Sequence, residues 1–193
     1  MKTFEKTLIS LSAATLCGVK PASLVSFSKA IFVQGCATVA SWNKILHAAG
    51  KRIRALRRGE ELFLVFVYDQ RLLEAALLQQ GVFSYLVHKG YDVQGGAEGA
   101  LQQLFLRLAH GTQFPHEVGV FLGYPLEDVA AYEKHAGAKS KFCGSWAVYG
   151  DVAAAQVKMT LYKRCSAFCT ALFDGGSDFE SICKKINLYA RSV

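Results

Sequence analysis

The sequence contains little proline, with only three prolines among its 193 residues. It also lacks any apolar stretch long enough to cross a bilayer, any internal repeat and any long linker. Hydrophobic residues make up 52% of the chain and aromatic residues 12%, which excludes a disordered protein because this much apolar material offsets the entropy lost on folding. We therefore expect a single domain over residues 1–193.

Common catalytic and metal-binding motifs are missing as well. His116-Glu117 does not begin an HExxH zinc motif, because the residue four positions after His116 is Val120. The glycine-rich segment 95–100 lacks the Lys-Ser/Thr of a Walker loop and the order of a GxGxxG fingerprint, and no GxSxG elbow occurs. None of the six cysteines forms a CxxC pair, so the sequence predicts neither a zinc ribbon nor a cysteine-bound iron–sulfur cluster, and no metal site is assigned.

The amino-terminal segment superficially resembles a secretion leader, because the apolar run Leu8–Leu16 is followed by Cys17. Charged residues interrupt the approach to this run, serines dilute it, and a bulky leucine precedes the cysteine, all of which argue against processing. We interpret the segment as an amphipathic helix over residues 4–16 and expect a cytoplasmic protein that does not enter a membrane. In that compartment the six cysteines are expected to be free thiols.

Hydrophobic periodicity predicts a mixed α/β fold. The run Leu62–Tyr68 (LFLVFVY) is apolar throughout, which is typical of a central strand covered on both faces. Extended segments near Ser23–Phe27 and Arg52–Leu56, and the alternating stretch FCGSWAVYGD at 142–151, would complete a small mixed sheet of about four strands. Helices are predicted over residues 4–16, 38–49, 70–89, 97–110, 116–123, 126–137, 152–173 and 179–189, so the C-terminal third is helical.

The net charge of +7 arises largely from one segment. Residues 51–58 contain five of the 22 basic residues, and without them 17 basic residues face 15 acidic ones. The five are Lys51, Arg52, Arg54, Arg57 and Arg58. The basic residues alternate with Ile53 and Ala55, which favours a solvated edge strand. No aromatic residues are interleaved with them, which argues against a platform for single-stranded nucleic acid. Nucleic-acid binding through residues 51–58 stays an alternative.

Two stretches within residues 114–151 have a distinctive pattern: FPHEVGVFLGYPLEDV at 114–129 and CGSWAVYGD at 143–151. They resemble the signature of an uncharacterised, mostly clostridial family catalogued as a domain of unknown function, with FPHEIGxFLGYPLEDVxGF followed by Cys-Gly-x-Trp-x-Val-Tyr-Gly-Asp. The resemblance extends to TLCGVKPASL at 15–24, where members have TLAGxKxxxL. This chain departs from the family at Ser12 and Ala14, where members often have cysteine and proline.

The resemblance implies no established activity. It implies a cytoplasmic protein of anaerobes, and it points to iron, haem or redox metabolism with a flavodoxin-like redox partner. Our first hypothesis is therefore a small-molecule-binding or accessory protein in that setting.

Three residues of this segment could carry covalent chemistry. The thiol of Cys143 and the imidazole of His116 would together make an activated nucleophile, and the carboxylate of Glu117 could orient the ring. The second hypothesis is therefore a Cys/His thiol-dependent enzyme acting on an acyl or thiol substrate. His116 and Glu117 also fit the first turn of a helix, where a glutamate favours the helix dipole.

Other residues of the motifs suggest ligand binding. Aromatic side chains could line a pocket for a flat ligand, and Lys20 could bind an anion. The candidate ligand-binding residues are Lys20, Tyr124, Trp146, Tyr149 and Asp151. Haem is one such ligand, and it would need an axial histidine or cysteine. If the segment is functional, we expect His116, Glu117, Cys143 and Tyr149 to line one concave surface.

Overall fold

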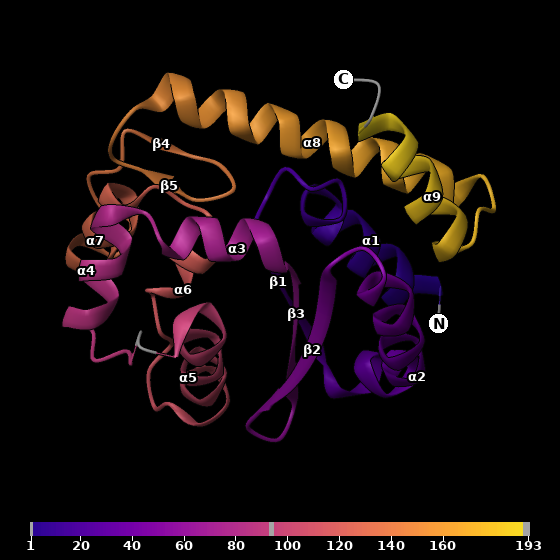
Figure 1. Cartoon of the computed structure of the whole chain (residues 1–193), viewed down its shortest axis with the longest axis horizontal. Helices are drawn as coiled ribbons and strands as arrows, with labels where there is room; N and C mark the ends of the chain where they lie inside the picture. Colours follow the sequence, from indigo (N-terminus) through magenta and orange to yellow (C-terminus); the bar gives the residue numbers. More distant parts are fainter. Residues whose placement is uncertain (1, 93–94, 191–193) are drawn as a thin grey trace.

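The computed structural model describes residues 2–92 and 95–190, and it confirms the α/β class (Figure 1). Its main sheet has three antiparallel strands in the order β1-β3-β2. These strands are β1 (Ala22–Ser28), β2 (Lys51–Arg58) and β3 (Leu62–Asp69). The apolar run predicted to be the central strand is β3, and the basic segment is the edge strand β2, as the sequence indicated.

The remaining predicted strand does not join this sheet. It folds back on itself as the hairpin β4 (Phe142–Cys143) and β5 (Ala147–Val148), in which Phe142 is paired with Val148. The turn is closed by the Gly144 N–H, which donates to the carbonyl of Trp146 at 3.1 Å. The expected single mixed sheet of about four strands is therefore an antiparallel sheet of three strands and a separate two-stranded hairpin.

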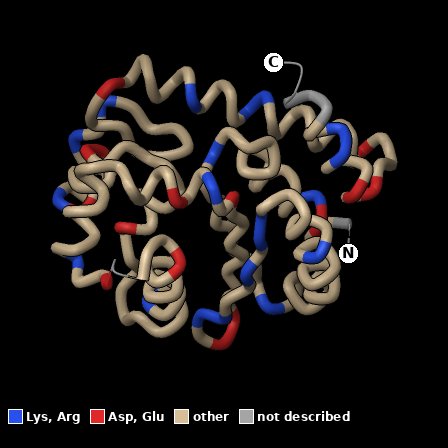
Figure 2. The backbone as a smooth tube through the Cα atoms, viewed as in Figure 1, with Lys and Arg blue, Asp and Glu red and all other residues tan. Residues whose placement is uncertain are grey.

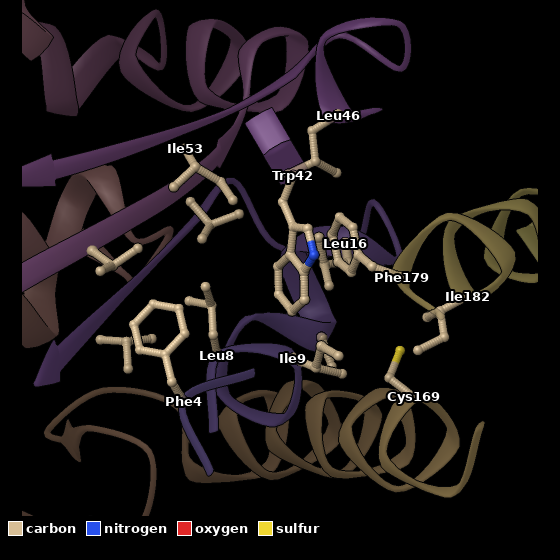
Figure 3. Packing of buried hydrophobic residues seen from close by; sticks show 14 of the residues in the cluster. Phe4, Leu8, Ile9, Leu16, Trp42, Leu46, Ile53, Cys169, Phe179 and Ile182 are labelled. Atoms are coloured by element: carbon tan, nitrogen blue, oxygen red, sulfur yellow. The ribbon is translucent and has the colours of Figure 1, made fainter. Parts of the chain in front are cut away.

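The side chains of β3 alternate between two hydrophobic clusters, as expected for a strand covered on both faces. Val65 and Val67 belong to the first cluster, which four helices complete (Figure 3). These helices are α1 (Lys2–Leu16), α2 (Lys29–His47), α8 (Val152–Asp174) and α9 (Phe179–Ala190). Trp42 stacks on Phe179 with ring centroids 3.8 Å apart, which joins α2 to the C-terminal helix.

The opposite face of β3 presents Leu64, Phe66 and Tyr68 to the second cluster. Five helices lie on this side: α3 (Gln70–Leu77), α4 (Gln80–His88), α5 (Gly96–His110), α6 (Val118–Phe121) and α7 (Leu126–His135). The helix predicted over 70–89 is thus two helices, and the one predicted over 116–123 is a single turn. The α3 helix is capped by Asp69, whose carboxylate accepts the N–H of Leu72 at 3.1 Å.

The long helix α8 connects the two halves of the molecule, running from the β4–β5 hairpin to α9 (Figure 1). Its first turn is capped by Asp151, whose carboxylate accepts the N–H of Ala154 at 3.0 Å. All six cysteines carry free thiols. Among the helices of residues 2–92 and 95–190, none has the length and apolar character needed to cross a bilayer.

Candidate functional site

A cavity of about 580 Å³ lies beside the signature motifs, between α6, α7 and the β4–β5 hairpin. Its wall is mostly aromatic and aliphatic, which is typical of small-molecule sites. The larger apolar side chains on the wall are Leu24, Phe114, Val118, Leu122, Tyr124, Val129, Tyr132 and Trp146. We call this space the site cavity.

Tyr124 and Trp146 form the ordered aromatic part of the wall. Their rings stack with centroids 4.8 Å apart and planes inclined by 20°. The indole N–H of Trp146 donates to Oδ2 of Asp128 at 2.8 Å, so the ring is held by a charge-assisted hydrogen bond as well as by packing. Both rings therefore have a fixed position on the cavity wall.

Asp128 is the polar centre of the site, and it was not among the residues predicted from the sequence. Besides the indole, its carboxylate accepts the backbone N–H groups of Tyr149 at 2.7 Å and Gly150 at 2.9 Å. The side chain is almost fully buried, with 2% of its residue surface exposed. It thus fastens the hairpin and the segment after it to α7. Its place in the LEDV motif was the only signal, and that motif does not distinguish Asp128 from its exposed neighbour Glu127.

His116 and Cys143 both line the site cavity, although they come from segments 27 positions apart in the sequence. Both residues are exposed. The imidazole lies edge-on to the ring of Tyr132, with centroids 5.2 Å apart. Among the described residues no hydrogen bond joins the thiol to the imidazole, so the structure brings the two groups to one surface without pairing them.

Glu117 points away from His116 and into the protein. Its carboxylate accepts hydrogen bonds from Nη1 of Arg107 at 2.9 Å and from the hydroxyl of Tyr91 at 3.2 Å. The Arg107 guanidinium also lies over the ring of Tyr91, 4.0 Å from its centroid. Burial and the nearby Glu117 raise the pKa of Tyr91. Glu117 therefore holds α5 against the chain before α6 and is not on the cavity wall.

Tyr149 and Asp151 also have structural partners instead of facing the site cavity. The hydroxyl of Tyr149 accepts the backbone N–H of Gly137 at 3.1 Å, which ties the end of α7 to the segment after the hairpin. Asp151 caps α8 as described. Of the four residues expected on one concave surface, two line the site cavity, namely His116 and Cys143.

Lys20 lies behind this wall, between two tyrosine rings. Its ammonium is 5.1 Å from the centroid of Tyr124 and 5.4 Å from that of Tyr162. The residue is 8% exposed, and within the described part of the chain its ammonium has neither a hydrogen bond nor an ion pair. Burial lowers the pKa of Lys20 to about 8, because it disfavours the charged form. Lys20 contacts the site through Tyr124 and is not among the residues lining the cavity.

The amino-terminal motif packs directly on the longer motif, about 100 positions away in the sequence. Pro21 lies against Gly123, whose φ is +78°. A Cβ atom on Gly123 would be only 2.6 Å from Cδ of Pro21, so this approach requires glycine. Together with the contact between Lys20 and Tyr124, it shows that the two motifs form one structural unit.

Most basic side chains of residues 51–58 form hydrogen bonds or ion pairs within the protein. Lys51 forms a buried ion pair with Asp69 at 3.3 Å, and Arg58 donates to the backbone carbonyls of Leu108 and Gly111. Arg57 donates to the carbonyl of Gly59 at 2.9 Å. These contacts leave less of the local charge available to phosphates than the sequence alone indicates.

A metal ion with several protein ligands has no site here: within residues 2–92 and 95–190, no three or more His, Cys, Asp or Glu side chains are placed to hold one. Haem iron needs fewer protein ligands, and His116 or Cys143 on the cavity wall could supply one.

The comparisons with known proteins found one family. The model of the family described as "Protein of unknown function (DUF3793)" matches residues 8–183, a range that includes the site cavity and both motifs. No curated protein and no solved structure matches the chain.

Proposed function

We propose that this chain, which belongs to the family "Protein of unknown function (DUF3793)", is a cytoplasmic small-molecule-binding protein. Its ligand is flat and largely apolar and binds in the site cavity. The observation that carries this proposal is the Tyr124–Trp146 stack on the cavity wall. A planar ligand would lie against these rings and displace water from an apolar surface.

The position of Asp128 supports binding over simple core packing. A buried carboxylate that fixes one indole and two backbone amides holds the wall in place before any ligand arrives. Preorganisation of this kind lowers the conformational entropy lost on binding. Phe114 and Tyr132 remain partly exposed beside the cavity, 40% and 36% respectively, so aromatic surface is available where a ligand would enter.

Haem is the ligand we propose to test first. It is flat and mostly apolar, and His116 or Cys143 could bind its iron from the cavity wall. An iron, haem or redox role with a flavodoxin-like partner follows from the family resemblance noted in the sequence, and haem binding would agree with it.

A spectroscopic titration tests this proposal. We expect a sharp Soret band that saturates at one equivalent of haem, and a shifted or weakened band for either His116→Ala or Cys143→Ala, whichever residue is the iron ligand. His88→Ala is the matched control, because His88 is at the end of α4 and does not line the cavity. A Soret band that keeps growing beyond several equivalents, or that responds to His88→Ala as strongly as to the cavity variants, would contradict specific binding.

A thiol-dependent enzyme is the second candidate, favoured by the exposed thiol of Cys143 and the imidazole of His116 on the same wall. Movement of either side chain on substrate binding would be needed to form the pair. If this candidate is right, iodoacetamide at mildly acidic pH should label Cys143 much faster than the exposed Cys36, and His116→Ala should abolish the difference. Equal labelling of Cys36 and Cys143 would leave no support for it.

A further inference from the structure

The edge strand β2 has unpaired backbone groups in the middle of its outer side. The N–H of Ile53 donates to Oδ1 of Asn43 at 2.8 Å, so it points away from β3. Outward and inward groups alternate along an antiparallel strand, and the N–H groups of Ala55 and Arg57 therefore also point outward. Neither of these two amides has a hydrogen-bond partner among the described residues.

A groove of about 760 Å³ follows the first half of this edge, along residues 52–55. On one face of the sheet it is bounded by apolar side chains of α2, chiefly Phe32, Val39 and Ala40. On the other face it is bounded by the polar side chains of Arg52, Arg54, Tyr68 and Glu98. The groove therefore accommodates side chains on both sides of the strand edge, as an added strand requires.

The charge of the residues along the groove determines which kind of strand can bind there. Basic residues recur along β2 (Figure 2), and Arg54, which lines the groove, is exposed. Among the described residues that line the groove, Glu98 is the one acidic residue, and it accepts a hydrogen bond from Gln102 at 2.7 Å. Two arginines, Arg52 and Arg54, line the same groove. Pairing β2 with a second copy of itself would bring two basic strands together, which like-charge repulsion disfavours.

We propose that the outer edge of β2 binds an extended acidic segment of a partner protein, which adds to the sheet as a further strand beside residues 54–57. Asn43 occupies the outer side of Ile53 and sets one limit of the added strand. Acidic side chains of the partner lie on the face of Arg54, and the alternate, apolar side chains face α2.

Amide hydrogen exchange measured by NMR tests this proposal directly. The probe is a ten-residue peptide of alternating valine and glutamate with both ends blocked. In the free protein, the amides of Ala55 and Arg57 should exchange fast, whereas those of Arg54 and Leu56, which face β3, should be protected. Saturating peptide should slow exchange at Ala55 and Arg57 by at least about 10-fold and change the other two little.

Two charge-reversal variants separate specific pairing from general attraction. Arg54→Glu should weaken peptide binding by about 10-fold or more, while Lys158→Glu, which makes the same charge change on the exposed surface of α8, should weaken it by less than about 3-fold. Ala55→Pro removes an outward N–H without removing a bond to β3, and it should also weaken binding. A variant is compared only after its thermal melt shows that it folds.

Several results would overturn the proposal. Peptide binding without protection of Ala55 and Arg57, or equal losses for Arg54→Glu and Lys158→Glu, would show charge attraction alone. Protection that appears without peptide as the protein concentration rises would identify a second copy as the occupant. Protection produced equally by a ten-nucleotide single-stranded DNA would identify nucleic acid instead. The site-cavity ligand does not enter this test, so its outcome is independent of haem binding.

Discussion

Replacing Asp128 with asparagine should destabilise the protein strongly, although the two side chains have almost the same shape. Asp128 accepts three hydrogen bonds, from the indole of Trp146 and from the backbone amides of Tyr149 and Gly150. An asparagine has one acceptor oxygen and one NH₂ group that only donates. In its better orientation the oxygen keeps both backbone amides, and the NH₂ group faces the indole N–H.

The cost follows from these three bonds. Leaving the buried indole N–H without an acceptor costs about 1–3 kcal/mol, and the two remaining bonds lose the contribution of the charge, about 0.5 kcal/mol each or more. We therefore expect Asp128→Asn to lower the free energy of unfolding by about 2–4 kcal/mol. The matched control is Glu127→Gln, an exposed neighbour without a hydrogen bond or ion pair among the described residues, which should change it by less than about 0.5 kcal/mol.

Urea unfolding followed by circular dichroism measures both changes, provided that the slope with denaturant stays constant. A double-mutant cycle with Trp146→Phe identifies the cause, because phenylalanine has no N–H to leave unpaired. When residue 146 is phenylalanine, the decrease in the free energy of unfolding caused by Asp128→Asn should be about 1–2 kcal/mol smaller. Equal effects of Asp128→Asn and Glu127→Gln, or a cycle without coupling, would refute the assigned role of Asp128.

Two further predictions concern the contact between the motifs. Gly123→Ala should lower the free energy of unfolding by about 1–3 kcal/mol in urea melts, because the new side chain has a positive φ and clashes with Pro21. Gly18→Ala is the control: it has the positive φ without a clash, so it should lower the free energy of unfolding by less. Burial lowers the pKa of Lys20 in the folded protein from 10.5 to about 8. Between these pH values the unfolded chain binds more protons than the folded one, so the contribution of Lys20 to the free energy of unfolding rises with pH. Lys20→Met should therefore stabilise the protein at pH 7 by about 1–3 kcal/mol, with less gain at pH 10; a gain that is the same at both pH values would contradict this.

The sequence predicted β3 and the helices α1, α5, α8 and α9 to within about two residues, because their signals are local. The helix predicted over 38–49 was wrong at its start, since α2 begins nine residues earlier at Lys29. Leu62–Tyr68 is apolar without interruption, which is typical of a strand covered on both faces, and β3 is indeed the central strand. The stretch 142–151 was assigned to the same sheet incorrectly, since alternation is the same in a strand that pairs with β3 and in one that pairs with itself. Whether the stretch pairs with itself or with β3 depends on the turn at Gly144, which local periodicity does not reveal.

The site was harder to predict, because its residues acquire their partners only on folding. His116 and Glu117 are adjacent in the sequence and suggest one site, yet in the turn before α6 the imidazole is at the surface and the carboxylate is buried against Arg107. The partners of Asp128 lie about 20 positions further along the chain, so no spacing pattern marks it. Aromatic composition did indicate Tyr124 and Trp146, which the structure stacks on the cavity wall.

Fluorescence of Trp146 tests the proposed binding in the site cavity most directly. The chain has two tryptophans, so Trp42→Phe leaves Trp146 as the only one. In this background we expect protoporphyrin IX, which stacks without iron, to quench the emission and to saturate at one equivalent. Ser140→Phe, on the cavity wall, should block quenching, whereas Ala138→Phe, exposed in the same loop but away from the wall, should not. Quenching that fails to saturate, or that is the same in both phenylalanine variants, would contradict the proposal.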